Sequence, residues 1–307
     1  MRFTIYQDSR QGGRANNEDR TTYCYSREAL LMVVADGMGG HHHGEIASQI
    51  AVQTLADNFQ REARPAIADP FRFLQRGLTN AHSAILDYTV HHGLRDTPRT
   101  TCVACVVQDN VAFWAHAGDS RLFLMRGGKL IAQTRDHSRV RFLIEEGMLS
   151  ETQAAVHPER NKIYSCLGSP TPPEIEFSRK TPLKHGDILL LCSDGLWGEV
   201  SGEEMAVALK GANLVHAVPM LLNQAEARGG AQADNLSVVG VRWEDTYVEE
   251  PSSIISTQAM GFDEVATRME EFGRDPAHKV DLSEEEIEKA IEEIRSTIEK
   301  FNPRKPG

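Results

Sequence analysis

Residues 29–40 read ALLMVVADGMGG, and residues 189–197 read LLLCSDGLW. In each stretch an unbroken apolar run, which is typical of a buried β-strand, ends at or just before an Asp-Gly pair. A strand of this kind delivers the acidic residue that follows it, Asp36 in the first stretch and Asp194 in the second, to the rim of the core. A single Asp-Gly pair after a strand is usually only a turn. The two stretches therefore indicate either ordinary turns or two carboxylates placed at a rim.

Three further acidic clusters lie at the edges of predicted strands. They are NNEDR, with Glu18 and Asp19 directly before a strand, AHAGDSR, with Asp119 in a tight turn, and ADNLSVV, with Asp234 before the last strand. Taken alone, Asp119 and Asp234 are more typical of turn or cap residues. Five such clusters at strand edges make coincidence a poor explanation, so we favour a site at which the carboxylates converge.

Carboxylates gathered at one rim repel one another and attract hard divalent cations. Mg²⁺ and Mn²⁺ prefer oxygen ligands, with water completing their shell. Gly37, Gly39 and Gly40 allow the backbone to turn sharply and to bring a carbonyl group toward a metal. Two metals that share a carboxylate can hold and ionise a water between them. The residues therefore predict a magnesium or manganese site.

The predicted elements come in clusters of strands separated by helices, not in strict β-α-β alternation. Strands are predicted at residues 21–26, 30–35, 102–108, 111–117, 121–126, 129–132, 187–192 and 236–243, and helices at 45–63, 70–91, 203–209 and 216–228. The short connections Asp109-Asn110 and Gly127-Gly128 are typical of antiparallel hairpins. This pattern predicts an α+β domain at residues 1–244, a linker at 245–260 and a helical tail at 261–307.

The charge of the chain is concentrated near its end. The 307 residues contain 33 basic and 44 acidic side chains, a formal net charge of −11, and residues 245–307 alone hold 8 basic and 16 acidic ones, or −8. A net anion is a poor binder of nucleic acid or of an anionic membrane surface, so neither is expected as a partner. No apolar segment approaches the length of about 20 residues that spans a bilayer, and the first residues do not resemble a signal peptide. We therefore expect a cytoplasmic protein.

The five cysteines are Cys24, Cys102, Cys105, Cys166 and Cys192. Cys102 and Cys105 form a C-x-x-C pair, a spacing that also occurs in redox and zinc sites. They lie within the β-branched run TTCVACVV, where side chains three residues apart point to opposite faces of a strand. Buried, reduced thiols are therefore the favoured interpretation.

The order of the motifs resembles that of the protein phosphatase 2C-like family, in its bacterial form. The matching motifs are R-x-x-N-E-D, D-G-M-G-G-x-x-x-G-E-x-A-S, G-D-S-R, D-H-S, S-D-G-L and D-N, at residues 14–19, 36–48, 118–121, 136–138, 193–196 and 234–235. Residues 147–169 look like the flap of the bacterial members, and the resemblance covers about residues 1–243. It implies a four-layer α-β-β-α sandwich of two antiparallel sheets flanked by helices.

The resemblance also implies a set of metal ligands at the matching positions. Asp36 would bridge two metals, and the carbonyl group of Gly37 would ligate one of them. Asp194 and Asp234 would complete the shell of the first metal, and Asp119 with Asp194 would form a third site. The implied cofactors are Mn²⁺ or Mg²⁺, two at the core site and one at the third.

Three residues near the start of the chain take further roles by the same resemblance. Glu18 and Asp19 would either act on metal-bound waters or ligate a metal directly. Of the two, Glu18 is assigned as the catalytic residue and Asp19 as the metal ligand. Arg14 would clamp the phosphate of the substrate, because the planar fork of a guanidinium pairs bidentately with phosphate oxygens. Without the Asn-Glu-Asp that follows, Arg14 would be taken for a solvated surface residue.

The implied activity is that of a metal-dependent phosphatase acting on phosphoserine and phosphothreonine in proteins, by direct attack of a metal-bridging water. Its partners would be phosphorylated proteins, the substrates of a Ser/Thr kinase. A cysteine-based phosphatase is the weaker enzyme hypothesis, because no cysteine lies in a C-x5-R loop. Two more hypotheses are a phosphatase-like binding module and a small-molecule phosphatase on the same scaffold. A binding module predicts missing metal ligands, and none is missing.

The chain departs from the family pattern at several positions. Met38 stands where many eukaryotic members have a histidine that is thought to protonate the leaving group, and Arg99 stands where glycine is usual. His41, His42 and His43 follow in one loop, where consecutive histidines are more often solvated than catalytic. Arg99 is interpreted as an exposed loop residue, and His137 as a polar site residue or, at least equally, a structural hydrogen-bonding one.

The tail contains an amphipathic pattern. Ser283 and Glu286 form a capping box, and Ile287, Ile291, Ile294, Ile298 and Phe301 repeat at 4-3-4-3 spacing. Such a stripe is the seam of a helix that packs against a protein surface. The candidates for that surface are the chain's own core, a second copy of the chain and a protein partner.

Overall fold

The computed structural model describes residues 1–38, 43–150, 153, 157–159 and 162–245. All described residues belong to a single compact unit. The predicted linker, apart from Asp245, and the predicted helical tail lie outside the described residues. Within the described part of the chain, no helix is long and apolar enough to cross a membrane.

The first sheet is antiparallel, with the strand order β1-β13-β12-β8-β9. Its strands are β1 (Phe3–Arg10), β8 (Arg121–Arg126), β9 (Lys129–Gln133), β12 (Ile188–Cys192) and β13 (Leu236–Trp243). Strand β1 was not predicted, because FTIYQDSR has no apolar run and is only half-buried along its length. It forms because it pairs over all of its residues with β13, and this tertiary contact cannot be recognised from the sequence of the strand itself.

The second sheet is also antiparallel, with the order β10-β7-β6-β3-β2 and with β11 pairing with β7 as well. Its strands are β2 (Arg20–Tyr25), β3 (Ala29–Ala35), β6 (Cys102–Gln108), β7 (Val111–Ala117), β10 (Glu176–Phe177) and β11 (Thr181–Pro182). A separate short pair joins β4 (Gly37–Met38) to β5 (Arg99–Thr100). Strand β4 follows β3 after the single residue Asp36.

The tight connections have the backbone that hairpins need. Asp109 and Asn110 join β6 to β7 with φ of 54° and 58°, and Gly127 and Gly128 join β8 to β9 with φ of 58° and 82°. Two consecutive residues with positive φ are the signature of a type I′ turn, whose twist matches that of the flanking strands. Both predicted hairpins are therefore confirmed.

Helices cover the outer faces of the sheets. The long ones are α1 (Gly44–Glu62), α2 (Pro70–His91) and α7 (Leu214–Gly229), and the short ones are α3 (Arg139–Glu145), α5 (Asp194–Trp197), α6 (Gly202–Ala208) and the 3₁₀ turn η1 (Gly230–Gln232). Asp69 caps α2 by accepting a hydrogen bond from the Arg72 N–H at 3.1 Å. Ser201 and Glu204 cap α6 as a complete capping box.

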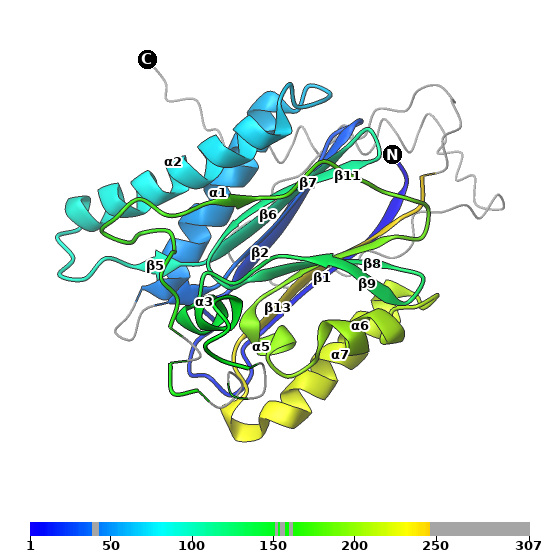
Figure 1. Cartoon of the computed structure of the whole chain (residues 1–307). Helices are drawn as coiled ribbons and strands as arrows, with labels where there is room; N and C mark the ends of the chain where they lie inside the picture. Colours follow the sequence, from blue (N-terminus) through cyan, green and yellow to red (C-terminus); the bar gives the residue numbers. More distant parts are fainter. Residues whose placement is uncertain (39–42, 151–152, 154–156, 160–161, 246–307) are drawn as a thin grey trace, which may run out of the picture. The chain divides into compact units, whose positions relative to one another are not determined.

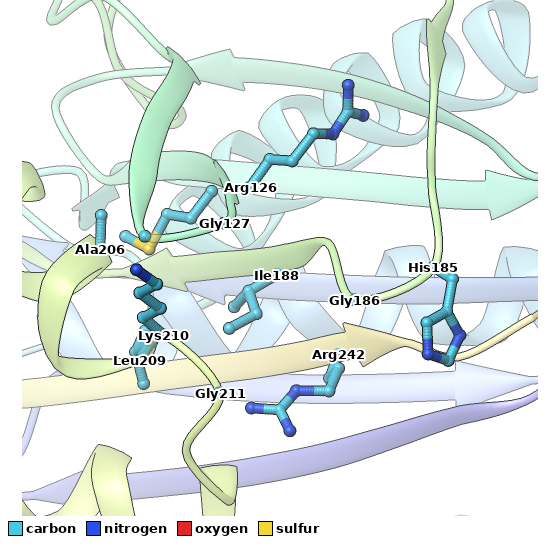
Figure 2. Close-up of a pocket in the computed structure, with 12 residues that line it drawn as sticks. Arg126, Gly127, His185, Gly186, Ile188, Ala206, Leu209, Lys210, Gly211 and Arg242 are labelled. Atoms are coloured by element: carbon cyan, nitrogen blue, oxygen red, sulfur yellow. The ribbon is translucent and has the colours of Figure 1, made fainter.

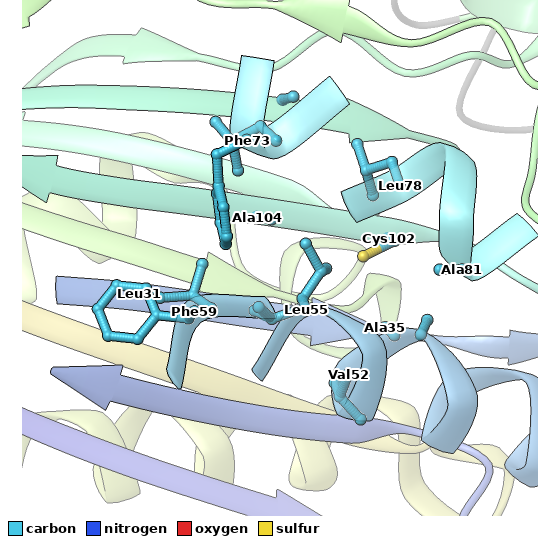
Figure 3. Packing of buried hydrophobic residues seen from close by; sticks show 14 of the residues in the cluster. Leu31, Ala35, Val52, Leu55, Phe59, Phe73, Leu78, Ala81, Cys102 and Ala104 are labelled. Atoms are coloured by element: carbon cyan, nitrogen blue, oxygen red, sulfur yellow. The ribbon is translucent and has the colours of Figure 1, made fainter. Parts of the chain in front are cut away.

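Three buried clusters hold the layers together. One lies between the sheets and contains Leu30, Met32 and Val34 of β3 with Leu189 and Leu191 of β12. The other face of β3 packs against α1 and α2, and Figure 3 shows Leu31 and Ala35 of β3 among side chains of these helices. The third cluster lies between the first sheet and helices α6 and α7. Figure 1 shows α1 and α2 (blue and cyan) outside one sheet and α6 and α7 outside the other, so the predicted four-layer α+β sandwich is confirmed.

All five cysteines are free thiols. Cys102 belongs to the cluster under α1 and α2, whereas Cys105 belongs to the cluster between the sheets. Burial raises the pKa of Cys102 to about 12 and raises that of Cys105 as well. The C-x-x-C pair therefore consists of two protonated thiols on opposite faces of β6, as predicted, and it is not a redox or zinc pair.

Candidate active site

Antiparallel register brings the predicted acidic residues to one end of the sandwich. In the first sheet Cys192, the last residue of β12, pairs with Val238 of β13 and with Arg121 of β8. The chain leaving β12 at Asp194 therefore meets the chain entering β13 from Asp234 and the turn that carries Asp119. In the second sheet Arg20 pairs with Ala35, which places Asp19 beside Asp36. Residues from five separate sequence segments thus share one rim.

A buried hydrogen bond joins the two sheets at this rim. The Ser193 hydroxyl donates to Oδ2 of Asp19 at 2.6 Å, and it accepts from the Ser237 N–H at 3.0 Å. Asp19 is only 1% exposed, and its other oxygen, Oδ1, is buried without a hydrogen-bond partner among the described residues. An unpaired buried carboxylate oxygen is costly, and it marks a position where a further ligand of the carboxylate is expected.

The carboxylates perturb one another strongly. Burial, followed by the charges of Asp19 and Asp194, raises the pKa of Asp36 well above its ordinary value. Burial raises the pKa of Asp19 to about 7 and that of Asp194 to about 6, with the charge of Asp234 adding to both. Burial and the charge of Asp194 likewise raise the pKa of Asp119. These shifts have the direction that crowded, desolvated like charges produce, and such clusters are typical of functional sites.

Gly37 allows the close backbone packing that the site requires. A Cβ atom at Gly37 would lie 2.3 Å from the carbonyl oxygen of Gly44 and 2.6 Å from that of Glu18. The Gly37 N–H donates to the Glu18 carbonyl at 3.2 Å. The segment carrying Glu18, the start of β4 and the start of α1 therefore meet at this residue, and no larger side chain fits there.

Glu18 is positioned through its backbone and through neighbours that lie far away in the sequence. Its N–H donates to Oδ1 of Asn235 at 2.8 Å, and its carbonyl accepts from the Ser48 hydroxyl at 2.5 Å. A Cβ atom at Gly44 would lie 2.5 Å from Oε2 of Glu18, which places that carboxylate at the start of α1. The predicted D-N motif thus includes a structural residue, Asn235, as well as Asp234.

Arg14 is held directly at the acidic rim. Its Nη2 donates to Oδ2 of Asp234 at 2.5 Å, and the pair is partly exposed, with Arg14 at 59% and Asp234 at 35%. The hydrogen bond to Asp234 raises the pKa of Arg14, and the charges of Asp194 and Asp36 add to this effect. The guanidinium is therefore a fixed positive charge beside the carboxylates and is open to solvent.

The position of Arg14 depends on two glycines whose role the sequence motifs did not indicate. A Cβ atom at Gly12, where φ is +61°, would lie 2.1 Å from the carbonyl oxygen of Asp234, and one at Gly13 would lie 2.4 Å from that of Ala231. The Gly13 N–H also donates to the Ala233 carbonyl at 2.8 Å. The signal for this close approach is the Gly-Gly pair directly before Arg14.

Arg121, two residues after Asp119, connects the turn that carries Asp119 to two other segments. Arg121 donates from Nε and Nη2 to the two oxygens of Asp136, both at 2.7 Å, and its guanidinium lies 3.5 Å from the ring centroid of Trp197. The charge of Arg121 lowers the pKa of Asp119, which opposes the effect of Asp194. The G-D-S-R and D-H-S motifs are thereby joined, and Arg121 packs over the helix that starts at Asp194.

The donor chemistry of the rim fits a hard divalent cation. The groups that converge are carboxylates, with a buried unpartnered oxygen on Asp19 and a closely packed glycine at position 37. Oxygen donors of this kind are the ligands that Mg²⁺ and Mn²⁺ take in proteins. Positive charge at the rim would also relieve the repulsion that raises the carboxylate pKa values.

The structure specifies the surroundings of two departures from the family pattern. Arg99 is exposed, as expected, but it lies in the short strand β5 and pairs with Met38 of β4, one residue from Gly37. It is therefore next to the acidic rim. His43 precedes α1 and accepts at its carbonyl from the Ile46 N–H at 3.0 Å, whereas His41 and His42 lie outside the described residues.

The pocket in Figure 2 is a different place. Its volume is about 300 Å³, and its lining includes Arg126, Lys210 and Arg242. It lies where β8 ends and β12 begins, which is the end of the first sheet opposite to Asp194. Arg126 is already paired with Asp187 through two contacts of 2.6 Å. This pocket therefore does not belong to the acidic site.

Comparison with known proteins agrees with this geometry. The family model "Protein phosphatase 2C" matches residues 7–233. The serine/threonine phosphatase Stp of Listeria monocytogenes is 31% identical over 229 residues, which is 74% of this chain and 90% of that protein. The Mycobacterium tuberculosis phosphatase PstP/Ppp superposes with a TM-score of 0.69 at 33% identity, covering 79% of this chain and 99% of that one.

A further solved structure bears on the metal. The catalytic domain of the phosphatase PstP in complex with two manganese ions superposes with a TM-score of 0.66 at 32% identity, covering 80% of this chain and 98% of that one. The predicted resemblance is therefore confirmed. The chain belongs to the protein phosphatase 2C family, whose members are metal-dependent hydrolases.

Proposed function

We propose that this enzyme removes phosphate from phosphoserine and phosphothreonine side chains of proteins. The observation that carries the proposal is the convergence of carboxylates from five sequence segments on one rim, with Arg14 beside them. Carboxylates for divalent cations and an exposed guanidinium for a phosphate are the components that phosphate hydrolysis by a metal enzyme needs. The relatives named serine/threonine phosphatases support the choice of substrate.

The cation ligands proposed are Asp36, Asp194, Asp234 and Asp19, together with the carbonyl group of Gly37. Asp119 with Asp194 is proposed to hold a third cation. When bound, a pair of Mn²⁺ or Mg²⁺ ions supplies the positive charge that ionises a water between them for direct attack on phosphorus. The two manganese ions of the PstP structure support this stoichiometry.

The remaining roles belong to side chains of the protein itself. The Arg14 guanidinium is proposed to bind two phosphate oxygens and to neutralise part of their charge, because its planar fork matches their geometry. Glu18 is proposed to orient the attacking water from the start of α1, where its carboxylate lies against Gly44. The thiols do not compete as nucleophiles, since burial raises the pKa of all five cysteines and leaves them protonated.

The site of action and the partners follow from the same proposal. The substrates are proposed to be cytoplasmic proteins phosphorylated by a Ser/Thr kinase. The acidic tail is proposed to bind a protein surface, with the domain itself, a second copy and a partner protein as the three candidates. Neither nucleic acid nor a membrane is proposed as a partner.

Hydrolysis of para-nitrophenyl phosphate and of a phosphothreonine peptide with Mn²⁺ tests the proposal. We expect turnover of both substrates, loss of activity on addition of EDTA and recovery with excess Mn²⁺. Asp36→Asn and Asp194→Asn should each abolish nearly all activity. Asp109→Asn is the matched control, because Asp109 is exposed in a turn with positive φ that asparagine also adopts. Turnover that ignores EDTA would overturn the metal mechanism, and absence of turnover with any divalent metal would favour a binding module.

A comparison of substrates separates the small-molecule hypothesis. Phosphopeptides, whole phosphoproteins and phosphorylated metabolites are assayed at equal concentration with the Mn²⁺ enzyme. A higher kcat/KM for phosphoproteins supports the proposal. A clear preference for one metabolite would contradict it.

A further inference from the structure

A second group of potential metal ligands lies beside the acidic rim. His116 is in β7, Glu176 is its register partner in β10, and His137 follows the D-H-S aspartate. One ligand atom from each of these three residues lies within 4.8 Å of the other two. The two imidazole rings stack with centroids 4.7 Å apart and an interplanar angle of 30°. None of these residues belongs to the carboxylate set.

The hydrogen bonds of His116 leave one nitrogen available as a ligand. Its Nε2 lies 2.6 Å from the carbonyl oxygen of Arg135. A carbonyl oxygen only accepts, so Nε2 carries the proton and the lone pair is on Nδ1. His116 is 2% exposed, and Nδ1 has no hydrogen-bond partner among the described residues. A ring whose far N–H is fixed by a carbonyl is the arrangement that metal-bound histidines adopt.

The other two residues complete the donor set. Oε2 of Glu176 lies 3.8 Å from Nε2 of His137, and Glu176 is 44% exposed while His137 is 3% exposed. The carboxylate of this partly exposed side chain therefore supplies negative charge beside the buried imidazoles. Burial lowers the pKa of both histidines, to about 4 for His137, so that protons do not compete for the rings at neutral pH.

We propose that His116 Nδ1, His137 Nε2 and the Glu176 carboxylate bind Zn²⁺, at a site separate from the carboxylate rim. Two imidazoles and one carboxylate are a ligand set that Zn²⁺ takes when its fourth position stays open to water or to another ligand. Mg²⁺ and Mn²⁺ favour the all-oxygen rim instead, so ligand chemistry distinguishes the two sites.

Binding at this site changes a hydrogen bond next to Asp119. In the structure, the Gly118 N–H donates to Nδ1 of His137 at 3.3 Å, so the proton of the neutral ring is on Nε2. Coordination through Nε2 requires this proton to move to Nδ1, and Gly118 then loses its acceptor. The ring keeps one proton throughout, and the bond that is lost is long. The His137 carbonyl also accepts from the Tyr164 N–H at 2.8 Å, which connects the site to residues 147–169.

Zinc binding by the full-length Asp36→Asn variant, without an affinity tag, tests the proposal. This variant weakens the carboxylate rim and leaves the three proposed ligands unchanged. Zn²⁺ affinity is measured by competition with a chromophoric chelator, and the zinc shell by X-ray absorption. Glu176→Gln is added to remove one ligand, and Glu174→Gln is the matched control, since the two glutamates lie two residues apart in the same segment.

We expect a zinc shell with imidazole scattering, and an affinity at least tenfold lower after Glu176→Gln but unchanged after Glu174→Gln. His116→Gln should reduce the imidazole scattering. The consecutive histidines 41–43 also attract zinc, so the comparison of the two glutamate variants is decisive. Equal affinities in the Glu176→Gln and Glu174→Gln proteins, or a zinc shell made only of oxygen, would overturn the proposal. Neither result depends on phosphatase activity.

Discussion

Replacing Asp19 with asparagine should stabilise the metal-free protein while it weakens metal binding. Asp19 is 1% exposed, and burial raises its pKa to about 7. With an ordinary value near 3.9, ionising this carboxyl at pH 8 costs the folded state roughly 4 kcal/mol more than the unfolded state. The amide keeps the shape of the side chain but has to replace the carboxylate as partner of Ser193. We therefore expect a net gain of roughly 2 kcal/mol for Asp19→Asn at pH 8.

The pH dependence follows from the same pKa. Between about pH 4 and pH 7 the folded wild type binds more protons at Asp19 than the unfolded chain does, so its stability falls as pH rises through this window. The Asp19→Asn variant lacks this contribution, so its advantage shrinks from pH 8 to pH 5. With saturating Mn²⁺ the order should reverse, since Asp19 is one of the proposed cation ligands and the wild type then gains more stability from binding.

Urea and thermal denaturation in EDTA at pH 5 and pH 8 measure these differences. A gain of roughly 2 kcal/mol corresponds to a rise in Tm of about 4–8 °C for a domain of this size. Asp109→Asn, at an exposed turn, is the control and should change the Tm little. A variant that is less stable than the wild type at pH 8 in EDTA, or an equal difference at both pH values, would refute the reasoning.

Three further predictions concern the rim. Arg14→Ala should lower kcat/KM roughly tenfold to a hundredfold, which is the value of a charge-assisted hydrogen bond to phosphate. The circular dichroism spectrum should stay unchanged because Arg14 is 59% exposed, and wild-type kinetics would contradict its role. Gly37→Ala should destabilise the protein by about 2 kcal/mol or more in thermal denaturation, because its Cβ would lie 2.3 Å from the Gly44 carbonyl oxygen; an unchanged Tm would show that the packing relaxes freely. Arg99→Ala should raise KM several-fold for a phosphopeptide with acidic flanks but not for para-nitrophenyl phosphate. Arg95→Ala, at another exposed position, should leave KM unchanged for both substrates. Equal effects of the two variants would contradict a role of Arg99 in substrate binding.

Parts of the fold were predictable because they depend on local chemistry. The buried strand β3 and the hairpin at Asp109-Asn110 are specified by residues that lie next to one another in the sequence. Strand β1 was not predictable in this way, since its sequence has no apolar run and its residues form a strand by pairing with β13, more than 220 positions away. The short helix α5 was also missed, because four residues are too few to show a helical period.

The candidate site likewise contains residues that were recognisable in the sequence and residues that were not. Acidic residues directly after or before apolar strands were visible as motifs, and their order carried the resemblance to the family. Their supports were not visible: Ser193 bonds to Asp19, and Asn235 bonds to Glu18, across separations of 174 and 217 residues. The proposed zinc ligands could not be recognised for the same reason, because His116, His137 and Glu176 share no spacing in the sequence.

The sequence by itself thus determined the strands, the turns and the kinds of side chain placed at the strand ends, since each of these is a matter of local residue chemistry. Only the tertiary structure decided which carboxylates are close enough to raise one another's pKa, how Arg14 comes to lie on Asp234, and which imidazole nitrogen in the described part of the chain is left without a partner. The physical reason is that electrostatic coupling and hydrogen bonding depend on distances of a few ångströms. Antiparallel register between distant segments sets those distances, and no local pattern records it.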